Sequence, residues 1–210
     1  MQSLDLRLRL ATIAVAIWLA ADLGVAISGG LIIAGLGGTG AIWSQAALQR
    51  VDSFTAIAGL VFMVAYLGSV IFVARWIYRA SENAHTLSDE LTISPGWAVG
   101  WYFVPFAALF KPFRAMRETW QVSLAPDHPD SVEVPQSMQV WWGLWILTNV
   151  LGNISFRLAL RAKSTDDFIL GGWIDIITFA VDVPLAVLLI MLMRQISANQ
   201  RSIVDTAIFE

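Results

Sequence analysis

Three polar residues lie deep inside apolar stretches of the sequence, where a charged or amide side chain is unusual. Asp22 falls near the middle of the first stretch, Asn149 near the middle of the third and Asp182 near the middle of the last. An ionised carboxylate at the centre of a membrane costs about 2.5–3.5 kcal/mol on insertion scales. Such residues therefore mark ion or proton sites, or polar contacts between helices. Their similar depths predict a cluster at the membrane midplane.

Helical spacing extends this cluster along the last two stretches. Asn149, Asn153 and Arg157 recur every four residues, and Asp175 and Asp182 are seven residues apart, so each set falls on one helical face. A short loop joins the two stretches, which are expected to be antiparallel neighbours. We expect Arg157 to pair with Asp175 and Asn149 to contact Asp182. The favoured interpretation is helix–helix adhesion, and the alternative is a proton or cation site.

The composition is that of a membrane protein. Of 210 residues, 57% are hydrophobic and 14% are charged, against about 45–50% and 25% in soluble domains. The absence of Cys excludes disulfides and thiol chemistry. A net charge of −3 with no long run of like charge argues against nucleic-acid binding. The two histidines lie far apart, and no serine-hydrolase elbow, H-E-x-x-H motif or P-loop is present. Gly35, Gly37 and Gly40 match the spacing G-x-G-x-x-G, but they follow a membrane helix and are interpreted as its cap and turn. We therefore predict no enzyme, cofactor or metal.

Four segments are long enough to span about 30 Å of hydrocarbon, which takes roughly 20 helical residues. They lie near 10–34, 54–78, 138–159 and 172–194. The sequence therefore predicts an all-α integral membrane protein, with one helical domain over residues 1–210. The first span also carries small residues every four positions, a face suited to close helix packing. Asp22 points away from that face.

A shorter apolar segment, S-P-G-W-A-V-G-W-Y-F-V-P-F-A-A-L-F-K-P, lies between the second and third spans. Pro105 would kink a helix there. If the segment does not cross the membrane, the chain has four spans with both termini inside, and the inner side carries a clear excess of Lys and Arg. If it crosses as a fifth span, that excess nearly vanishes. We expect four spans, with residues 95–124 re-entrant or lying at the interface, and keep five spans as the alternative.

The residues that follow this segment have an amphipathic pattern. Phe113, Met116 and Trp120 share one helical face, and Arg114 and Arg117 lie on another. This predicts a helix in the headgroup plane, or a helix packed on the ends of the spans. Five basic residues on the expected cytoplasmic side are candidate contacts for lipid phosphates or another anion. They are Arg75, Arg79, Lys111, Arg114 and Arg117.

Three longer motifs carry a resemblance to a known family. They are R-W-I-Y-R-A-S-E-N-A, S-P-G-W-A-V-G-W-Y-F-V-P-F-A-A-L-F-K-P-F-R-A-M-R-E-T-W and W-W-G-L-W-I-L-T-N-V-L-G-N-I-S-F-R. Over roughly residues 75–200 the chain resembles the bacterial membrane-protein family called domain of unknown function 4328. The resemblance implies a small polytopic bacterial protein and brings no established activity. The motif residues singled out are Asn83, Trp97, Trp101, Pro105, Pro112 and Trp120.

These observations predict a non-enzymatic accessory or scaffold bundle that docks lipid or partner proteins. The alternative is a small proton- or ion-coupled transporter or channel that uses the Asp, Asn and Arg cluster. The expected partners are membrane lipids, other membrane proteins or a second copy of the chain, and not nucleic acid. The expected location is the bacterial inner membrane, with several spans and both termini in the cytoplasm.

Overall fold

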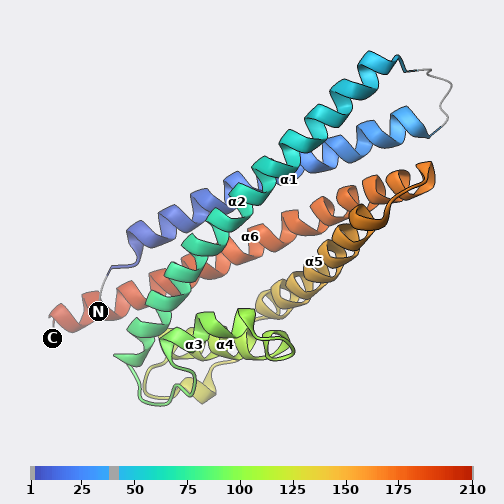
Figure 1. Cartoon of the computed structure of the whole chain (residues 1–210). Helices are drawn as coiled ribbons and strands as arrows, with labels where there is room; N and C mark the ends of the chain where they lie inside the picture. Colours follow the sequence, from blue (N-terminus) through green and yellow to red (C-terminus); the bar gives the residue numbers. More distant parts are fainter. Residues whose placement is uncertain (1–2, 38–42, 210) are drawn as a thin grey trace. The chain divides into compact units, whose positions relative to one another are not determined.

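The computed structural model describes residues 3–37 and 43–209, and within these residues the chain is helical with no strand (Figure 1). Four long helices dominate it: α1 (Asp5–Leu36), α2 (Gln45–His85), α5 (Gln136–Arg161) and α6 (Thr165–Phe209). Each contains a stretch long and apolar enough to cross a membrane. The all-α prediction with four membrane-spanning helices is confirmed. The helices extend beyond the apolar stretches, most of all in α2 and α6.

Short elements fill the chain between α2 and α5. They are α3 (Pro95–Gly100), the 3₁₀ turns η1 (Trp101–Phe103) and η2 (Ala107–Leu109), α4 (Lys111–Leu124) and the 3₁₀ turn η3 (Pro129–Ser131). Pro105 lies between η1 and η2, so it separates two turns instead of kinking a helix. The five-span alternative needs a continuous helix of spanning length in residues 95–110, and these residues do not form one.

The described chain groups into two compact units. The first unit comprises Met1–Ile13, Val70–Trp142 and Val187–Glu210, and the second comprises Ala14–Ser69 and Gly143–Ala186. Each of the four long helices contributes residues to both units, so neither unit is a continuous piece of sequence. The predicted single domain over residues 1–210 therefore stays a prediction.

In the second unit, small side chains bring α1 against α2. Ideal Cβ placement at Gly24 would put that atom 3.8 Å from Cβ of Ala58. Four residues on, the hydroxyls of Ser28 and Thr55 are 2.6 Å apart. The small-residue face of α1 thus packs on α2, as its spacing predicts, because small side chains let helix backbones approach closely. Asp22 lies on a different face and contacts α6.

Apolar side chains also cover the outside of the second unit. Ile57, Leu60 and Val64 of α2 are all highly exposed and recur at helical spacing. A soluble protein would bury such a stripe, because its transfer from water to an apolar medium is favourable. Contact with the hydrocarbon of a membrane would remove this stripe from water just as burial in a protein core does.

In the first unit, a buried glutamine joins three helices. Gln200 of α6 is 1% exposed. Its Nε2 donates to the carbonyl of Ala80 in α2 and to Ser123 Oγ in α4, both at 2.9 Å, and its Oε1 accepts from Asn83 Nδ2 at 3.2 Å. A further bond joins α2 to α6, from Trp76 Nε1 to Ser197 Oγ, 3.1 Å away. These bonds fix α4 against the ends of α2 and α6, because buried polar groups tolerate few other arrangements.

Candidate functional site

Two carboxyl groups meet inside the second unit. Asp22 of α1 and Asp182 of α6 are buried, at 3% and 1% exposure, and their side chains are in hydrogen-bonding contact. Thr148 Oγ1 of α5 donates to Asp182 Oδ1 at 2.5 Å. Further along α6, Asp175 Oδ1 accepts from Ser155 Oγ at 2.9 Å. Of the predicted cluster, Asp22 and Asp182 therefore meet, and the Thr148 hydroxyl of α5 is a neighbour of Asp182. The Ser155 hydroxyl of α5 bonds to Asp175 instead.

The predicted contacts of Asn149 and Arg157 are wrong. Asn149 is exposed and donates to the carbonyl of Trp145 at 2.7 Å, and Arg157 donates to Asn153 Oδ1 at the same distance. The side chains of α5 that reach the aspartates are instead Thr148 and Ser155. One residue changes the direction of a helical side chain by about 100°, so the amide and guanidinium stripe turns away from α6.

The candidate basic residues do not form one cluster. Arg79 pairs with Glu82, and Arg75 is exposed, its carbonyl accepting a hydrogen bond from Arg7. Arg117 is half-buried, and its Nε has no hydrogen-bond partner in the described part of the chain. Lys111 and Arg114 line a common pocket.

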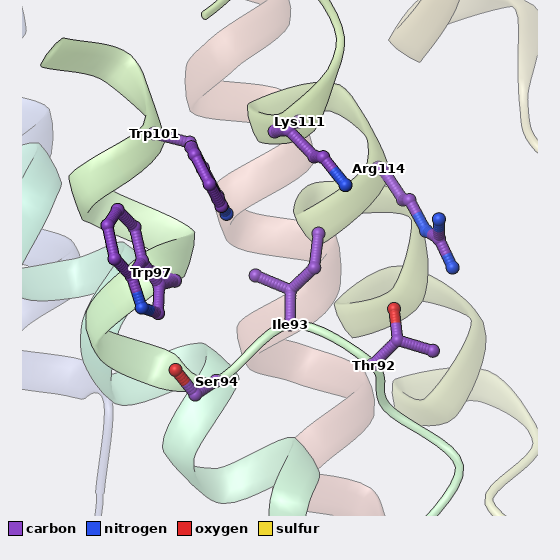
Figure 2. Close-up of a pocket in the computed structure, with 7 residues that line it drawn as sticks. All are labelled: Thr92, Ile93, Ser94, Trp97, Trp101, Lys111 and Arg114. Atoms are coloured by element: carbon purple, nitrogen blue, oxygen red, sulfur yellow. The ribbon is translucent and has the colours of Figure 1, made fainter. Parts of the chain in front are cut away.

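That pocket has a volume of about 340 Å³ and lies between α3 and the start of α4. Figure 2 shows Trp97 and Trp101 on one side, Lys111 and Arg114 on the other and the 92–94 strip of chain below them. The two indole rings stack with centroids 4.3 Å apart, and Lys111 Nζ lies 5.7 Å from the centroid of the Trp101 ring. This distance lies within the range of a cation–π contact, about 6 Å from the ring centroid.

Glu118 is hydrogen-bonded to three of the residues that line the pocket. It accepts hydrogen bonds from Thr92 Oγ1, from the backbone N–H groups of Thr92 and Ile93, and from Arg114 Nε at 2.9 Å. Burial alone would raise the pKa of Glu118, but these hydrogen bonds outweigh it and hold the pKa below its usual value. Glu118 therefore stays ionised and engages Arg114, which leaves Lys111 as the pocket's available cation.

An exposed aromatic segment lies directly before Lys111. We call residues 101–110 the aromatic loop. Phe103, Phe106 and Phe110 are highly exposed, Phe106 at 83%. Phe106 has φ 62° and ψ −47°, and the N–H of Ala107 bonds to the carbonyl of Pro105 at 2.7 Å. This is a γ-turn of the rare positive-φ kind, which is strained for a side chain other than glycine. Burial does not explain why a phenylalanine occupies this position.

A comparison with protein-family models finds one that matches residues 40–198 and is described as Domain of unknown function (DUF4328). The chain belongs to the DUF4328 family. The resemblance seen in the sequence is therefore confirmed. No curated protein and no solved structure matches this DUF4328 protein. Family membership assigns no reaction, so the function must be argued from the sites.

The family motif residues of the DUF4328 protein have structural positions in the first unit. Asn83 belongs to the Gln200 network, and Pro112 and Trp120 are buried on α4. Trp97 and Trp101 form the stacked wall of the pocket. Thus α4 buries Met116 and Trp120 in the unit, as expected for a helix packed on other helices.

Sequence reasoning missed Gln200, Ser123, Thr148 and Ser155. Gln200 had a usable signal, since it continues the buried α6 stripe of Met193, Ile196 and Ser197 at helical spacing. The hydroxyl residues had no such signal, because serine and threonine in an apolar helix commonly bond to their own backbone.

Proposed function

We propose that this DUF4328 protein is a non-enzymatic membrane component whose aromatic loop enters the lipid interface, while Lys111 binds the phosphate of an anionic lipid. In this proposal the loop and the Trp97–Trp101–Lys111 pocket act together, and the bundle serves as an accessory or scaffold element. The proposed location is a bacterial inner membrane, with both termini in the cytoplasm.

The observation that carries the proposal is the exposure of Phe103, Phe106 and Phe110 in the aromatic loop, with Phe106 on a strained turn. Exposed aromatic rings are unfavourable in water and favourable at the boundary between headgroups and acyl chains. The loop belongs to the same chain as four membrane-spanning helices, so a bilayer is the nearest available partner. Strain at Phe106 is of the kind retained at functional positions.

Charge supports a lipid as the occupant. Lys111 immediately follows the loop, and Arg114 and Arg117 follow on α4. Basic residues beside inserted aromatic groups favour anionic headgroups, at about 1 kcal/mol for each charge near the surface. The tryptophans complete the arrangement, since indole rings prefer the headgroup level.

The proposal predicts that Lys111→Gln weakens the binding of anionic lipid. The loss of about 1 kcal/mol corresponds to roughly a fivefold drop in affinity. Retention of phosphatidylglycerol by the purified full chain, followed by native mass spectrometry, measures the effect. Lys163→Gln is the matched control, because it removes the same charge at an exposed position outside the pocket.

If both variants retain phosphatidylglycerol as the wild type does, the pocket is not a headgroup site. Equal weakening in both variants would mean that net charge, and not the pocket, attracts the lipid. The transporter alternative from the sequence stays a prediction. The Asp22–Asp182 pair supports that alternative only as far as proton binding. A carboxyl pair does not by itself indicate that a cargo is transported.

A further inference from the structure

The contact between α1 and α6 in the second unit contains two carboxyl groups and no described basic partner. We propose that Asp22 and Asp182 form a reversible binding site for one shared proton. The proposal concerns a different unit of the chain from the lipid-docking function and does not depend on it.

The geometry of the pair requires a proton between the two carboxyl groups. Both aspartates are more than nine-tenths buried, and their carboxyl groups are hydrogen-bonding neighbours. Ionised carboxylates only accept hydrogen bonds, so a bond between two carboxyl groups needs a proton on one of them. Two ionised carboxylates in contact would also repel each other strongly in a low-dielectric interior.

The hydrogen bonds around the pair indicate which residue carries the proton. Asp182 already accepts the hydroxyl of Thr148, which stabilises its negative charge. Asp22 instead has a buried oxygen, Oδ2, with no hydrogen-bond partner in the described part of the chain. A buried oxygen without a donor costs far less on a neutral carboxylic acid than on a carboxylate. Asp22 is therefore the acid, and its O–H donates to Asp182.

The charge balance is simple. A proton from water binds the Asp22 carboxylate and forms its O–H bond, and the O–H group then donates to an oxygen of Asp182. The charge of the pair changes from −2 to −1, and no other reactant takes part. When the proton leaves, the pair holds two adjacent negative charges inside the bundle.

Among the described residues, no basic side chain next to Asp22 and Asp182 could neutralise the pair in place of the proton. The titratable groups that interact electrostatically with the pair are Tyr66 of α2 and Asp175 of α6, while α5 contributes the uncharged Thr148. Arg157 of α5 is exposed and bonded to Asn153. No group of three or more described His, Asp or Glu residues is placed to hold a metal ion. A proton is thus the smallest ligand that neutralises one of the charges.

The site lies in an interface that its charge would affect. About two helical turns from Asp22, Gly29 of α1 packs directly on Gly172 of α6. The carboxyl pair and the glycine contact are two attachment points between the same helices. Loss of the proton would push α1 and α6 apart at one of these points, so the site makes the packing of these helices sensitive to pH.

Infrared spectroscopy of the reconstituted full chain tests the proposal. At neutral pH the wild type should show the carbonyl band of a protonated carboxylic acid, which shifts in D₂O and disappears on alkaline titration. Asp22→Asn should abolish the pair's band, because the amide donates to Asp182 as the acid did. Asp175→Asn, at a neighbouring buried carboxyl, should retain the pair's band.

Thermal unfolding provides the second measurement and shows whether each variant folds. The native wild type binds a proton that the unfolded chain releases at neutral pH, so its stability should fall as the pH rises. Asp22→Asn has no such proton and should lose this part of the pH dependence. A wild type without the acid band, or an Asp22→Asn variant that folds and keeps the full band, would overturn the proposal.

Discussion

Replacing Gly29 by alanine should destabilise the α1–α6 contact, whereas the same change at Gly30 should not. A Cβ at Gly29 would lie 2.7 Å from the carbonyl oxygen of Gly172 and 2.9 Å from its Cα. These are backbone atoms of another helix, so the helices themselves must move. Overpacking of this kind costs about 1–3 kcal/mol.

Gly30 is the matched control, because it is the next residue of the same helix and has no atom within 4 Å of its ideal Cβ. Alanine there should be neutral or stabilising by up to about 1 kcal/mol, since it favours helix more than glycine does. Thermal unfolding of both variants in the same detergent measures the difference. If Gly29→Ala melts at or above the temperature of Gly30→Ala, the close approach of α1 to α6 is wrong.

Replacing Gln200 by methionine should cost about 2–4 kcal/mol. The side chain keeps its approximate size but loses the hydrogen bonds to Asn83, Ala80 and Ser123. The cost is large because Gln200 is buried, and polar atoms left behind in a dry interior forfeit their hydrogen bonds to water as well. The variant should unfold at a lower temperature or lower denaturant concentration than the wild type.

Gln195→Met is the control for this substitution. Gln195 lies on the same helix and is exposed, so the same chemical change there should alter stability by less than about 0.5 kcal/mol. Equal effects at positions 195 and 200 would contradict the role of Gln200 in joining α2, α4 and α6.

The apolar stretches were sufficient to predict the long helices but not their ends. The criterion for a span is set by hydrocarbon thickness, whereas a helix continues for as long as its backbone and packing permit. Thus α2 continues past Arg75 to His85, and α6 continues past Arg194 to Phe209. The polar residues that join these extensions, such as Gln200, lie outside the apolar windows.

The depth of the buried aspartates was predictable, but their neighbours on α5 were not. Depth follows from residue number, because each residue adds a fixed rise along the helix. Which side of α5 faces α6 depends on the rotation of each helix about its axis. The repeating pattern of Asn149, Asn153 and Arg157 indicated the wrong side of α5. The structure turns Thr148 and Ser155 toward α6 and leaves the larger polar groups outside.

Two local features, the turn at Phe106 and the Gly29–Gly172 contact, could be predicted only in part from the sequence. Pro105 marks a turn, but a positive φ is expected at glycine and not at Phe106. The Gly29–Gly172 contact is equally hard to foresee. The four-residue pattern of small residues on α1 indicates its α2 face, and a single pair of glycines on two distant helices has no periodicity to detect.

The most direct test of the membrane-docking account is the depth of residue 106 in a bilayer. The chain contains no cysteine, so a single cysteine at Phe106 can carry an environment-sensitive fluorophore in liposomes. A cysteine at Ser131, an exposed residue of the η3 turn, is the aqueous reference. The account predicts that the probe at 106 is quenched by nitroxide-labelled lipid and protected from iodide, while the probe at 131 shows the reverse. Equal iodide quenching at both positions would contradict insertion of the aromatic loop.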